Sequence, residues 1–466
     1  MEGQIIIMKK VFPQEVLQSE SIAIADDNGK SLTYKQLADQ AGSLSQLIEA
    51  RSLIFILCDK HIETVELIYE TLYLNIVPLL LSADINQEML DDLIAIYRPG
   101  YIYSPKKRAI APPYPIVREF AEHRLFATGF ERYPLHPDLA LLLSTSGTTG
   151  SPKLVKLSYE NLQDSAKHTS LHLSIEKGQK GISPLPLNHV YGLTFCFWHW
   201  YREATLLVTE KSVIGNEFRE FYERERANNF AATPYTYQML ERIQFWNPEI
   251  LSYLHLALSS GAQMSEKDQL NLVSLMRDKF WIAYGQTECT CMMAAMNFAE
   301  DNMKLGSVGK AFRNMEVILD NQTHELCIKS KSVAMGYAVG MEDLALGDVN
   351  QGVWRTGDIG HIDADGCIFL RGRLARFIKI LGKRISLDEI ERYIKKKLTG
   401  IETACVGTDD DLTVYYSNDG TLPKEEIVNI LVLDLKIPRR FITCRYIEEI
   451  PVNAAGKIMY NQLRAL

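Results

Sequence analysis

Short apolar runs alternate with helix-like stretches along the first half of the chain. Leu53–Leu57 and Val77–Leu81 have the length and composition of buried strands, whereas Tyr34–Glu49 has the apolar spacing of a helix. Strands that alternate with helices in this way are typical of α/β proteins with largely parallel sheets. The proline-rich segment 112–115 interrupts the alternation and predicts a loop or a connection between subdomains.

The pattern changes in the last quarter of the chain. Two short apolar runs within residues 359–370 flank the turn Asp363–Gly366, whose Asp-Gly pair suits a tight hairpin. Phe377–Ile380 predicts another strand, and Ser386 with Glu389 has the spacing of a capping box at the start of a helix. We therefore predict an α/β fold with a large N-terminal domain of α/β subdomains, residues 1–372, and a smaller α+β C-terminal domain, residues 373–466.

Length and composition support a folded protein of two or three units. The chain has 466 residues, of which 47% are hydrophobic and 23% are charged, as in soluble globular proteins. The formal net charge of -8 argues against nucleic-acid binding, which depends on clustered Lys and Arg. The basic run Lys395–Lys397 falls in the last turns of a predicted helix, where a solvated face is a simpler interpretation than a binding patch.

Targeting signals and metal-binding cysteine pairs are not evident. The apolar patch Ile5–Met8 is far shorter than the core of a signal peptide. Ile76–Leu81 and Leu193–Trp200 fall well short of the roughly 18 residues that span a bilayer, so we expect no membrane span and a cytoplasmic protein. The eight cysteines are scattered, and Cys289 and Cys291 are too close for a Cys-x-x-Cys site, so most should be buried free thiols.

The strongest chemical signal is a loop of hydroxyls and glycines that follows an apolar strand. Leu139–Leu143 leads into Ser144–Lys153, which reads Ser-Thr-Ser-Gly-Thr-Thr-Gly-Ser-Pro-Lys. Glycines let backbone N–H groups approach phosphate oxygens, hydroxyls add donors, and the lysine adds a positive charge. The spacing differs from the Gly-x-x-x-x-Gly-Lys-Ser/Thr loop of many NTPases, and a flexible Ser/Gly connector is the alternative. A proline and a lysine so close to a strand favour phosphate binding.

Three further segments carry candidate chemistry. Tyr284–Glu288 follows the apolar run Phe280–Ala283, and ligands of open α/β sheets collect where strands end. In this segment the aromatic ring of Tyr284 suits a nucleotide base, the hydroxyl of Thr287 suits a phosphate, and the carboxylate of Glu288 suits a metal ion. The alternatives are that Tyr284 packs in the core and that Glu288 is a solvated side chain. Asp358 has the acceptor geometry for two ribose hydroxyls, although turn aspartates are commoner. The loop Pro451–Lys457 ends in a lone lysine and means little by itself.

Together and in this order, the four segments resemble the adenylate-forming superfamily, which contains acyl-CoA synthetases, peptide-synthetase adenylation domains and luciferases. The resemblance covers nearly the whole chain, and so many ordered matches are hard to obtain by chance. Further matching segments are Leu32–Tyr34, Pro186–Gly192, Ser260–Gln263, Glu325–Leu326, Gly336–Tyr337, Arg355–Gly360, Gly372–Glu391 and Gly456–Lys457.

The resemblance implies that a carboxylate attacks the α-phosphate of ATP, giving an acyl-adenylate and pyrophosphate, and that the acyl group then passes to a thiol. Lys457 would be the catalytic lysine, Thr287 would hold the α-phosphate and Glu288 would bind Mg²⁺. Asp358 and Arg373 would bind ribose. The other nucleotide-binding positions would be Thr145, Ser146, Gly147, Thr148, Thr149 and Lys153 at the phosphates, and Gly261, Ala262, Gln263, Ala283, Tyr284 and Gly285 around adenine.

The resemblance also implies a mobile C-terminal domain, and three positions depart from the family pattern. Leu154 stands where relatives usually have glycine, for which we expect a local effect. Ala375 replaces the aspartate of the hinge pattern Gly-Arg-x-Asp, so the hinge is expected at Arg376 or to operate differently. Tyr460 replaces a common basic residue.

The identity of the acid and of the acceptor is only partly readable. His189 resembles a histidine beside the acyl pocket of acyl- and aryl-CoA synthetases, although a structural histidine is the alternative. Amino-acid-activating relatives have an aspartate in this neighbourhood, whereas residues 188–200 contain no acid, and an unpaired buried ammonium is costly. We therefore expect a small non-amino carboxylic acid as substrate, and coenzyme A or a phosphopantetheinyl acyl carrier protein as acceptor. An amino-acid adenylation enzyme serving a separate carrier protein and a non-catalytic nucleotide-binding relative are the alternatives.

Overall fold

The computed structural model describes residues 11–111, 113–144, 153–299, 304–381, 383–398, 400–418, 424–452 and 457–466. The chain forms two compact units. The larger contains the chain up to Lys304, with Lys310–Glu316 and Ile328–Trp354, and the smaller contains Leu305–Gly309, Val317–Cys327 and Arg355–Leu466. This division gives residues 355–372 to the smaller unit, whereas the sequence prediction gives them to the larger domain, and the predicted boundary stays a prediction.

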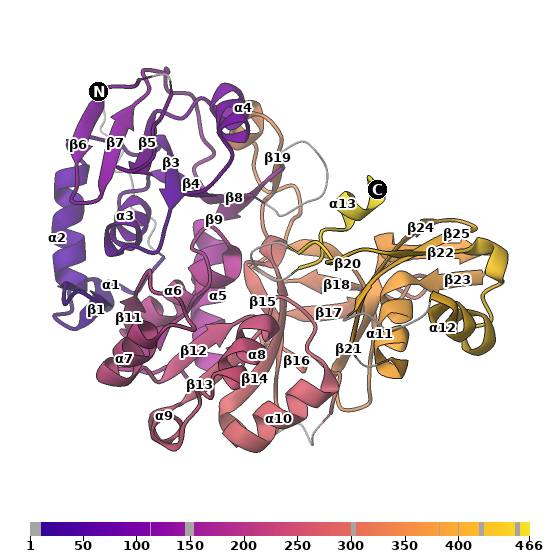
Figure 1. The fold of residues 1–466 in the computed structure, drawn as a ribbon. Helices are drawn as coiled ribbons and strands as arrows, with labels where there is room; N and C mark the ends of the chain where they lie inside the picture. The colour runs from indigo at the N-terminus through magenta and orange to yellow at the C-terminus, as the bar shows by residue number, and fades with distance from the viewer. Residues whose placement is uncertain are drawn as a thin grey trace. The chain divides into compact units, whose positions relative to one another are not determined.

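A nine-stranded sheet forms one layer of the larger unit (Figure 1). Its order is β16-β15-β14-β13-β12-β10-β11-β1-β2, and the six strands from β14 to β1 run parallel. The carboxyl ends of β13 and β14 therefore lie at the same edge. The strands are β1 Ile22–Asp26, β2 Ser31–Thr33, β10 Lys180–Ile182, β11 Thr205–Val208, β12 Asn229–Ala232, β13 Leu256–Ser259, β14 Phe280–Gln286, β15 Cys291–Asn297 and β16 Lys310–Ala311.

An eight-stranded sheet of order β19-β9-β8-β4-β3-β5-β7-β6 forms the second layer. Its four inner strands β8, β4, β3 and β5 are parallel, as the apolar runs predicted. Leu154 is fully buried in β9, where it pairs with Ser144 and Ala338, so the large side chain that replaces the usual glycine fills the core. The strands are β3 Leu53–Cys58, β4 Val77–Ser82, β5 Tyr101–Pro105, β6 Ile116–Glu119, β7 His123–Ala127, β8 Leu139–Ser144, β9 Leu154–Ser158 and β19 Gly336–Ala338.

Helices lie between and around the two sheets of the larger unit. Helices α3 and α5 each contact strands of both sheets, and α5 packs on α6 (Figure 1). The aromatic residues of α6 from Phe195 to Trp200 are at most 1% exposed and pack in the core. The helices are α1 Gln14–Leu17, α2 Tyr34–Leu44, α3 Ile62–Tyr73, α4 Gln87–Tyr97, α5 Tyr159–His172, α6 Val190–Tyr201, α7 Asn216–Glu225, α8 Pro234–Arg242, α9 Pro248–Tyr253 and α10 Glu266–Met276.

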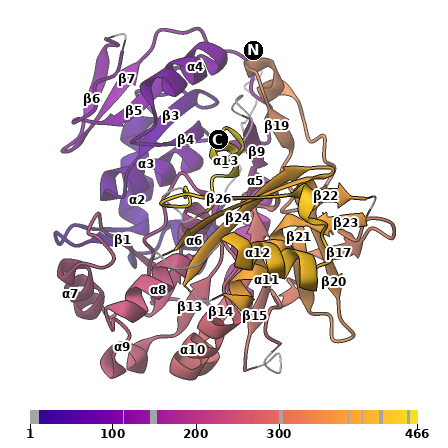
Figure 2. The same cartoon turned by 45° about the vertical axis from the view of Figure 1, so that its right-hand side comes forward.

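The smaller unit combines a four-stranded sheet, a short hairpin and a three-stranded sheet of order β24-β25-β26. Helices α11 and α12 pack on the three-stranded sheet (Figure 2). The elements are β17 Glu316–Leu319, β18 Glu325–Lys329, β20 Val353–Ile362, β21 Ile368–Arg373, β22 Phe377–Ile380, β23 Lys383–Ser386, β24 Ile401–Thr408, β25 Asp411–Asn418, β26 Ile442–Tyr446, α11 Leu387–Lys397, α12 Lys424–Asn429 and α13 Tyr460–Arg464.

Most local predictions agree with these elements. The hairpin around Asp363–Gly366 joins β20 to β21, and Ser386 begins α11 by accepting the Glu389 N–H at 3.2 Å. The predicted helix from Tyr34 ends at Leu44 rather than at Glu49. All eight cysteines are buried free thiols, as expected. None of the described helices combines the length and the apolar character that a membrane crossing requires.

Candidate functional site

The sequence Tyr-Gly-Gln that follows the apolar run of β14 continues the strand rather than ending it. Ala283 and Tyr284 are buried, at 6% and 8% exposed. The pairing of β14 with β15 shifts between Tyr284 and Gly285, and a Cβ atom at Gly285 would lie 1.7 Å from the carbonyl oxygen of Cys291. Glycine is therefore the one residue type that lets the two strands approach so closely here. The short 3₁₀ helix Thr287–Cys289 follows directly.

A carboxylate, a phenol and an ammonium meet just beyond this strand. The hydroxyl of Tyr337 in β19 donates to Glu288 Oε1 at 2.6 Å, and Lys153 Nζ lies 5.7 Å from the centroid of the Tyr337 ring. Glu288 is half-buried, and its carbonyl accepts the Ala334 N–H at 2.9 Å. Glu288 lies between β14 and β15 of the nine-stranded sheet, and Lys153 precedes β9 of the eight-stranded sheet. The Tyr337 side chain therefore connects the two sheets at this point.

Two residues of this region had no role in the sequence predictions. Tyr337 belongs to the matching segment Gly336–Tyr337, which could have identified it. Trp354 gave no such signal: its ring meets that of Tyr337 edge to face with 5.8 Å between centroids, and its Nε1 donates to Gln286 Oε1 at 3.0 Å. These contacts hold the end of β14 beside β19.

The predicted adenine-binding loop lies among the described residues, whereas most of the predicted phosphate-binding loop does not. Gly261, Ala262 and Gln263 are exposed and follow β13, the parallel neighbour of β14. Gly261 has a φ of +92°, a left-handed conformation that favours glycine. The predicted phosphate-binding residues Thr145, Ser146, Gly147, Thr148 and Thr149 lie outside the described residues, and the predicted strand before them is confirmed as β8.

The two predicted ribose-binding residues lie together in the smaller unit. Asp358 in β20 is cross-strand partner to Arg373 in β21, and Arg373 Nε lies 3.1 Å from Asp358 Oδ1. Asp358 is 6% exposed, and its N–H donates to the hydroxyl of Thr356 at 3.0 Å. The hydroxyl of Thr356 in turn donates to the Leu326 carbonyl of β18 at 2.8 Å. These bonds hold the backbone of β20 around Asp358 in place.

His189 lies at the start of a helix, and Lys457 lies just before a short β-bridge. His189 is half-buried at the start of α6, and its N–H donates to the Pro186 carbonyl at 3.2 Å. A Cβ atom at Gly192 would lie 2.3 Å from the same carbonyl oxygen, so glycine allows this tight entry into α6. Lys457 is half-buried in the smaller unit, immediately before an antiparallel bridge between Ile458 and Val452.

A small hollow of about 20 Å³, which is room for about one water molecule, lies beside α6. Its lining is mostly apolar, and Lys60 is its charged member. Lys60 Nζ donates to the Pro184 carbonyl, and burial lowers the pKa of Lys60 to about 8 although the charge of Glu210 opposes that change. The other lining residues are Val65, Ser183, Leu185, Leu187, Gly192, Phe195, Cys196, Leu206, Leu207, Val208 and Thr209.

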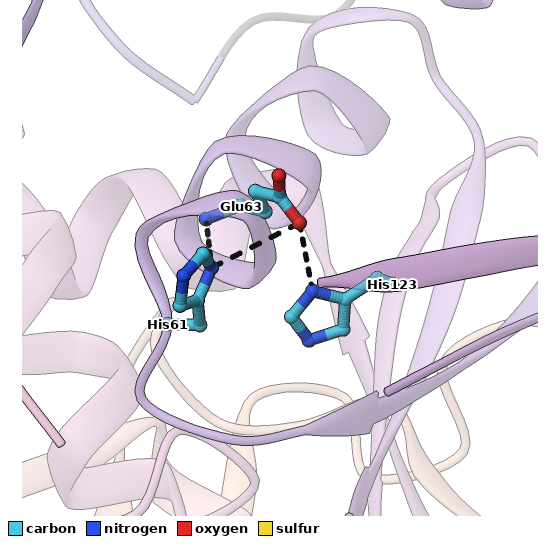
Figure 3. Close-up of side chains that lie close together, drawn as sticks. All are labelled: His61, Glu63 and His123. Carbon is cyan, nitrogen blue, oxygen red and sulfur yellow. Dashed lines mark hydrogen bonds and ion pairs between the residues drawn. The ribbon is translucent and has the colours of Figure 1, made fainter. Parts of the chain in front are cut away.

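Among the described residues, His61, Glu63 and His123 form a group whose spacing could suit a metal ion (Figure 3). His123 is fully buried, and its Nδ1 and Nε2 lie 2.9 Å from Glu63 Oε2 and from Asp59 Oδ2. A ring nitrogen that donates to a carboxylate carries a proton and has no lone pair for a metal. We therefore interpret Asp59, Glu63 and His123 as an ionic cluster, called the His123 cluster below.

The pKa values of the His123 cluster follow this geometry. Burial disfavours the imidazolium, but the hydrogen bonds and charges of Asp59 and Glu63 outweigh it and raise the pKa of His123 to about 9. Burial likewise opposes ionisation of Glu63, but hydrogen bonds from His123 and from the backbone of Glu122 and Ala121 lower its pKa to about 2. The His123 cluster thus consists of an imidazolium and two carboxylates, and it connects the start of α3 to the start of β7.

Comparison with known proteins identifies relatives over most of the chain. A protein-family model described as AMP-binding enzyme matches residues 14–338. The chain is 28% identical over 359 residues to 4-coumarate–CoA ligase CCL1 of Humulus lupulus, which covers 71% of this chain and 65% of the relative. It is 24% identical over 469 residues to 2-succinylbenzoate–CoA ligase of Bacillus pumilus, which covers 94% of this chain and 93% of the relative.

Solved structures show the same fold. O-succinylbenzoate CoA synthetase (MenE) of Bacillus subtilis, in complex with the acyl-adenylate intermediate, superimposes with a TM-score of 0.78 at 19% identity, covering 96% of this chain and 95% of that chain. ATP-bound MatB from Rhodopseudomonas palustris gives a TM-score of 0.80 at 19% identity, covering 98% and 99%. Both alignments extend over the two units, so the predicted fold class is confirmed.

Proposed function

Because the chain belongs to the family of AMP-binding enzymes, we propose that it is an AMP-forming acid–thiol ligase. In the first step a carboxylate oxygen attacks the α-phosphate of ATP, and pyrophosphate leaves. In the second step a thiol attacks the carbonyl of the acyl-adenylate, AMP leaves, and a thioester forms. Both steps require the protein to place anionic groups and to stabilise developing charge.

The Glu288, Tyr337 and Lys153 group is the observation that carries this proposal. The hydroxyl of Tyr337 orients the Glu288 carboxylate, and carboxylate oxygen is a ligand type that Mg²⁺ prefers. When bound, Mg²⁺ would neutralise charge on the phosphate oxygens. Glu288 would hold the ion, Thr287 would bind the α-phosphate, and Lys153 would act with the loop 145–149 on the β- and γ-phosphates.

We assign the remaining roles from the family pattern and from the local geometry. Asp358 would accept hydrogen bonds from the ribose hydroxyls, and Arg373 would hold the Asp358 carboxylate in place through their ion pair. Ala283, Tyr284 and Gly285, with Gly261, Ala262 and Gln263, would surround adenine. Lys457 would stabilise the charge that develops between the substrate carboxylate and the nucleotide.

The acid is proposed to be a non-amino carboxylic acid with an apolar body. The segment that begins α6 holds His189, and residues 188–200 contain no acid that could pair with a substrate ammonium. The side chains that line the small hollow beside the same helix are mostly apolar, which also supports this choice. The named ligases among the relatives use coenzyme A as acceptor, so we propose coenzyme A as the thiol, with a carrier protein as the alternative.

Acid-dependent exchange of labelled pyrophosphate into ATP tests the adenylation step. The acid panel should contain 4-coumarate, 2-succinylbenzoate, linear fatty acids, dicarboxylic acids and amino acids. We expect exchange with one of the non-amino acids, and a loss of about 10²-fold when Glu288 is replaced by Gln. Exchange with amino acids alone would support the amino-acid adenylation alternative. A folded, ATP-binding protein that gives no exchange with any acid would refute the proposal.

A further inference from the structure

Tyr460 lies in a buried ionic cluster of the smaller unit. Its ring centroid is 3.6 Å from Arg376 Cζ, and its hydroxyl donates to Glu391 Oε2 at 3.0 Å. Arg376 donates from Nη2 to Glu391 Oε1 at 2.7 Å and from Nε to Asp388 Oδ1. Arg376 and Glu391 are each 9% exposed. We call Arg376, Asp388, Glu391 and Tyr460 the Arg376 cluster.

The Arg376 cluster covers the outer edge of strand β24. The Cys405 N–H donates to Glu391 Oε1 at 2.6 Å, and the Cys405 carbonyl accepts from Arg376 Nη1 at 3.1 Å. The other edge of β24 pairs with β25. The cluster thus satisfies main-chain groups that an edge strand would leave unpaired. Since α11 and α13 pack on opposite faces of this sheet, the bond between Tyr460 and Glu391 joins the two helices around the edge.

The segment that contains Lys457 is fixed by the same contacts. Ile458 pairs with Val452, and the Met459 N–H donates to the Pro451 carbonyl at 2.8 Å. Tyr460 follows at once and begins α13, whose Leu463 is fully buried. The backbone after Lys457 is therefore held by a short bridge and then by the Tyr460 side chain, which leaves little freedom for the lysine's main chain.

We propose that Tyr460 and Arg376 are positioning residues that hold Lys457 for adenylation, an inference that rests on the role proposed for Lys457 above. A guanidinium over the face of an aromatic ring is favourable, and the hydroxyl adds a charge-assisted bond to Glu391. A basic side chain at position 460 would instead bring a like charge against Arg376. Tyrosine at position 460 is thus the complement of arginine at position 376, which gives a physical reason for this departure from the family pattern.

Three substitutions separate the parts of this contact. Tyr460→Phe keeps the ring and removes the hydroxyl, Tyr460→Leu removes both, and Tyr460→Arg adds a like charge. With the acid that gives the fastest exchange in the wild-type protein, we expect kcat of ATP–pyrophosphate exchange to fall in that order, by about tenfold for Tyr460→Leu, because small displacements of a catalytic group are expensive. KM for ATP should stay unchanged, since the nucleotide contacts are not altered.

Tyr393 of α11, the helix that also carries Glu391, offers a matched control. Its hydroxyl donates to Asp434 Oδ2 at 3.0 Å, so Tyr393→Phe removes a bond of the same chemistry and length at a distance from Lys457 in the sequence. We expect this variant to keep the wild-type kcat. A fall in kcat together with a rise in the KM for ATP, in any Tyr460 variant, would indicate a general loss of structure and overturn the positioning role.

Amide hydrogen exchange of residues 457–463 tests the contact without any activity. Tyr460→Leu should exchange faster over this stretch, and Tyr393→Phe should not. Unchanged protection in Tyr460→Leu overturns the inference, as does a wild-type kcat for that variant. If the wild-type protein shows no pyrophosphate exchange with any acid, the proposed function fails, whereas hydrogen exchange still decides whether the cluster holds the Lys457 stretch.

Discussion

The two buried ionic clusters place similar chemistry in different surroundings. In the larger unit, Asp59 and Glu63 flank the imidazole of His123, and in the smaller unit Asp388 and Glu391 flank the guanidinium of Arg376. An imidazole loses its charge near neutral pH unless its neighbours hold the proton, whereas a guanidinium stays charged. The first cluster ties the start of α3 to β7, and the second adjoins Lys457. In this protein the titratable cation, His123, stabilises its own surroundings, whereas the permanently charged Arg376 lies beside the segment that contains the proposed catalytic Lys457.

The largest expected effect tests whether the Arg376 cluster acts through Lys457. Lys457→Ala should lower kcat for acid-dependent exchange by about 10³-fold and leave ATP binding intact, because one stabilising charge is lost at the reacting centre. Adding Tyr460→Phe to Lys457→Ala should then change nothing further, since a positioning residue has no effect once its target is absent. Exchange kinetics and ATP binding by calorimetry measure both outcomes. Independent, additive losses in the double variant would separate Tyr460 from Lys457.

Arg376→Met should have the next largest effect, on the stability of the smaller unit. It removes the cation between two carboxylates and uncovers the main-chain groups of Cys405. Breaking a buried pair in this way destabilises by about 3 kcal/mol or more. Urea unfolding followed by fluorescence provides the measurement. If Arg376→Met were as stable as the wild-type protein at every pH, the Arg376 cluster would contribute little to the free energy of unfolding. The comparison with the His123 cluster would then be weaker.

The His123 cluster should give a smaller effect that depends on pH. The pKa of His123 is raised from 6.5 to about 9, so stabilisation by its charge is complete below pH 6.5 and is lost as the pH rises through about 9. The pKa of Glu63 is lowered from 4.5 to about 2, so its contribution is present above pH 4.5 and is lost as the pH falls toward about 2. Both contributions are present between about pH 4.5 and pH 6.5. His123→Gln should therefore lower the free energy of unfolding most in this range, by about 1–3 kcal/mol near pH 6.

The measurement is the free energy of unfolding of the wild-type protein and of His123→Gln, near pH 6 and near pH 9.5. The difference between the two proteins should shrink at the higher pH, where most of the wild-type imidazole is neutral. Arg376→Met serves as the internal comparison, because its destabilisation should be nearly the same at both pH values. A difference for His123→Gln that does not change with pH would show that His123 acts by packing rather than by charge.

The sequence predicts the local parts of the site better than the contacts between them. The strand before Ser144, the hairpin that pairs Asp358 with Arg373, and the N-cap at Ser386 all follow from short patterns, because neighbouring residues determine them. The strand β14 extends past the apolar run because Gly285 allows close pairing with β15, a property that apolarity does not show.

Long-range contacts escaped prediction for a different reason. Tyr337 meets Glu288 across 49 positions of the chain, and Tyr460 meets Glu391 across 69 positions. Such pairs depend on how sheets and helices pack, and no periodicity along the chain records them. The family pattern supplied roles for Glu288 and Lys457, but it treated Tyr460 as a minor departure. The tertiary contact with Arg376 is the observation that supports the positioning role proposed for Tyr460.

The smallest expected effect concerns zinc at His61, Glu63 and His123. Three potential ligands lie close together, yet both ring nitrogens of His123 face carboxylates at 2.9 Å, and the Nδ1 atom of His61 accepts the Glu63 N–H at 3.4 Å. A metal would have to displace a proton from His123 and release charge pairing that already stabilises the site. We therefore expect the thermal midpoint near pH 6 to be the same with EDTA and with equimolar Zn²⁺, in both the wild-type protein and His61→Gln. A midpoint that rises with Zn²⁺ in the wild-type protein and not in His61→Gln would instead identify a metal site, and would end the analogy between the two clusters.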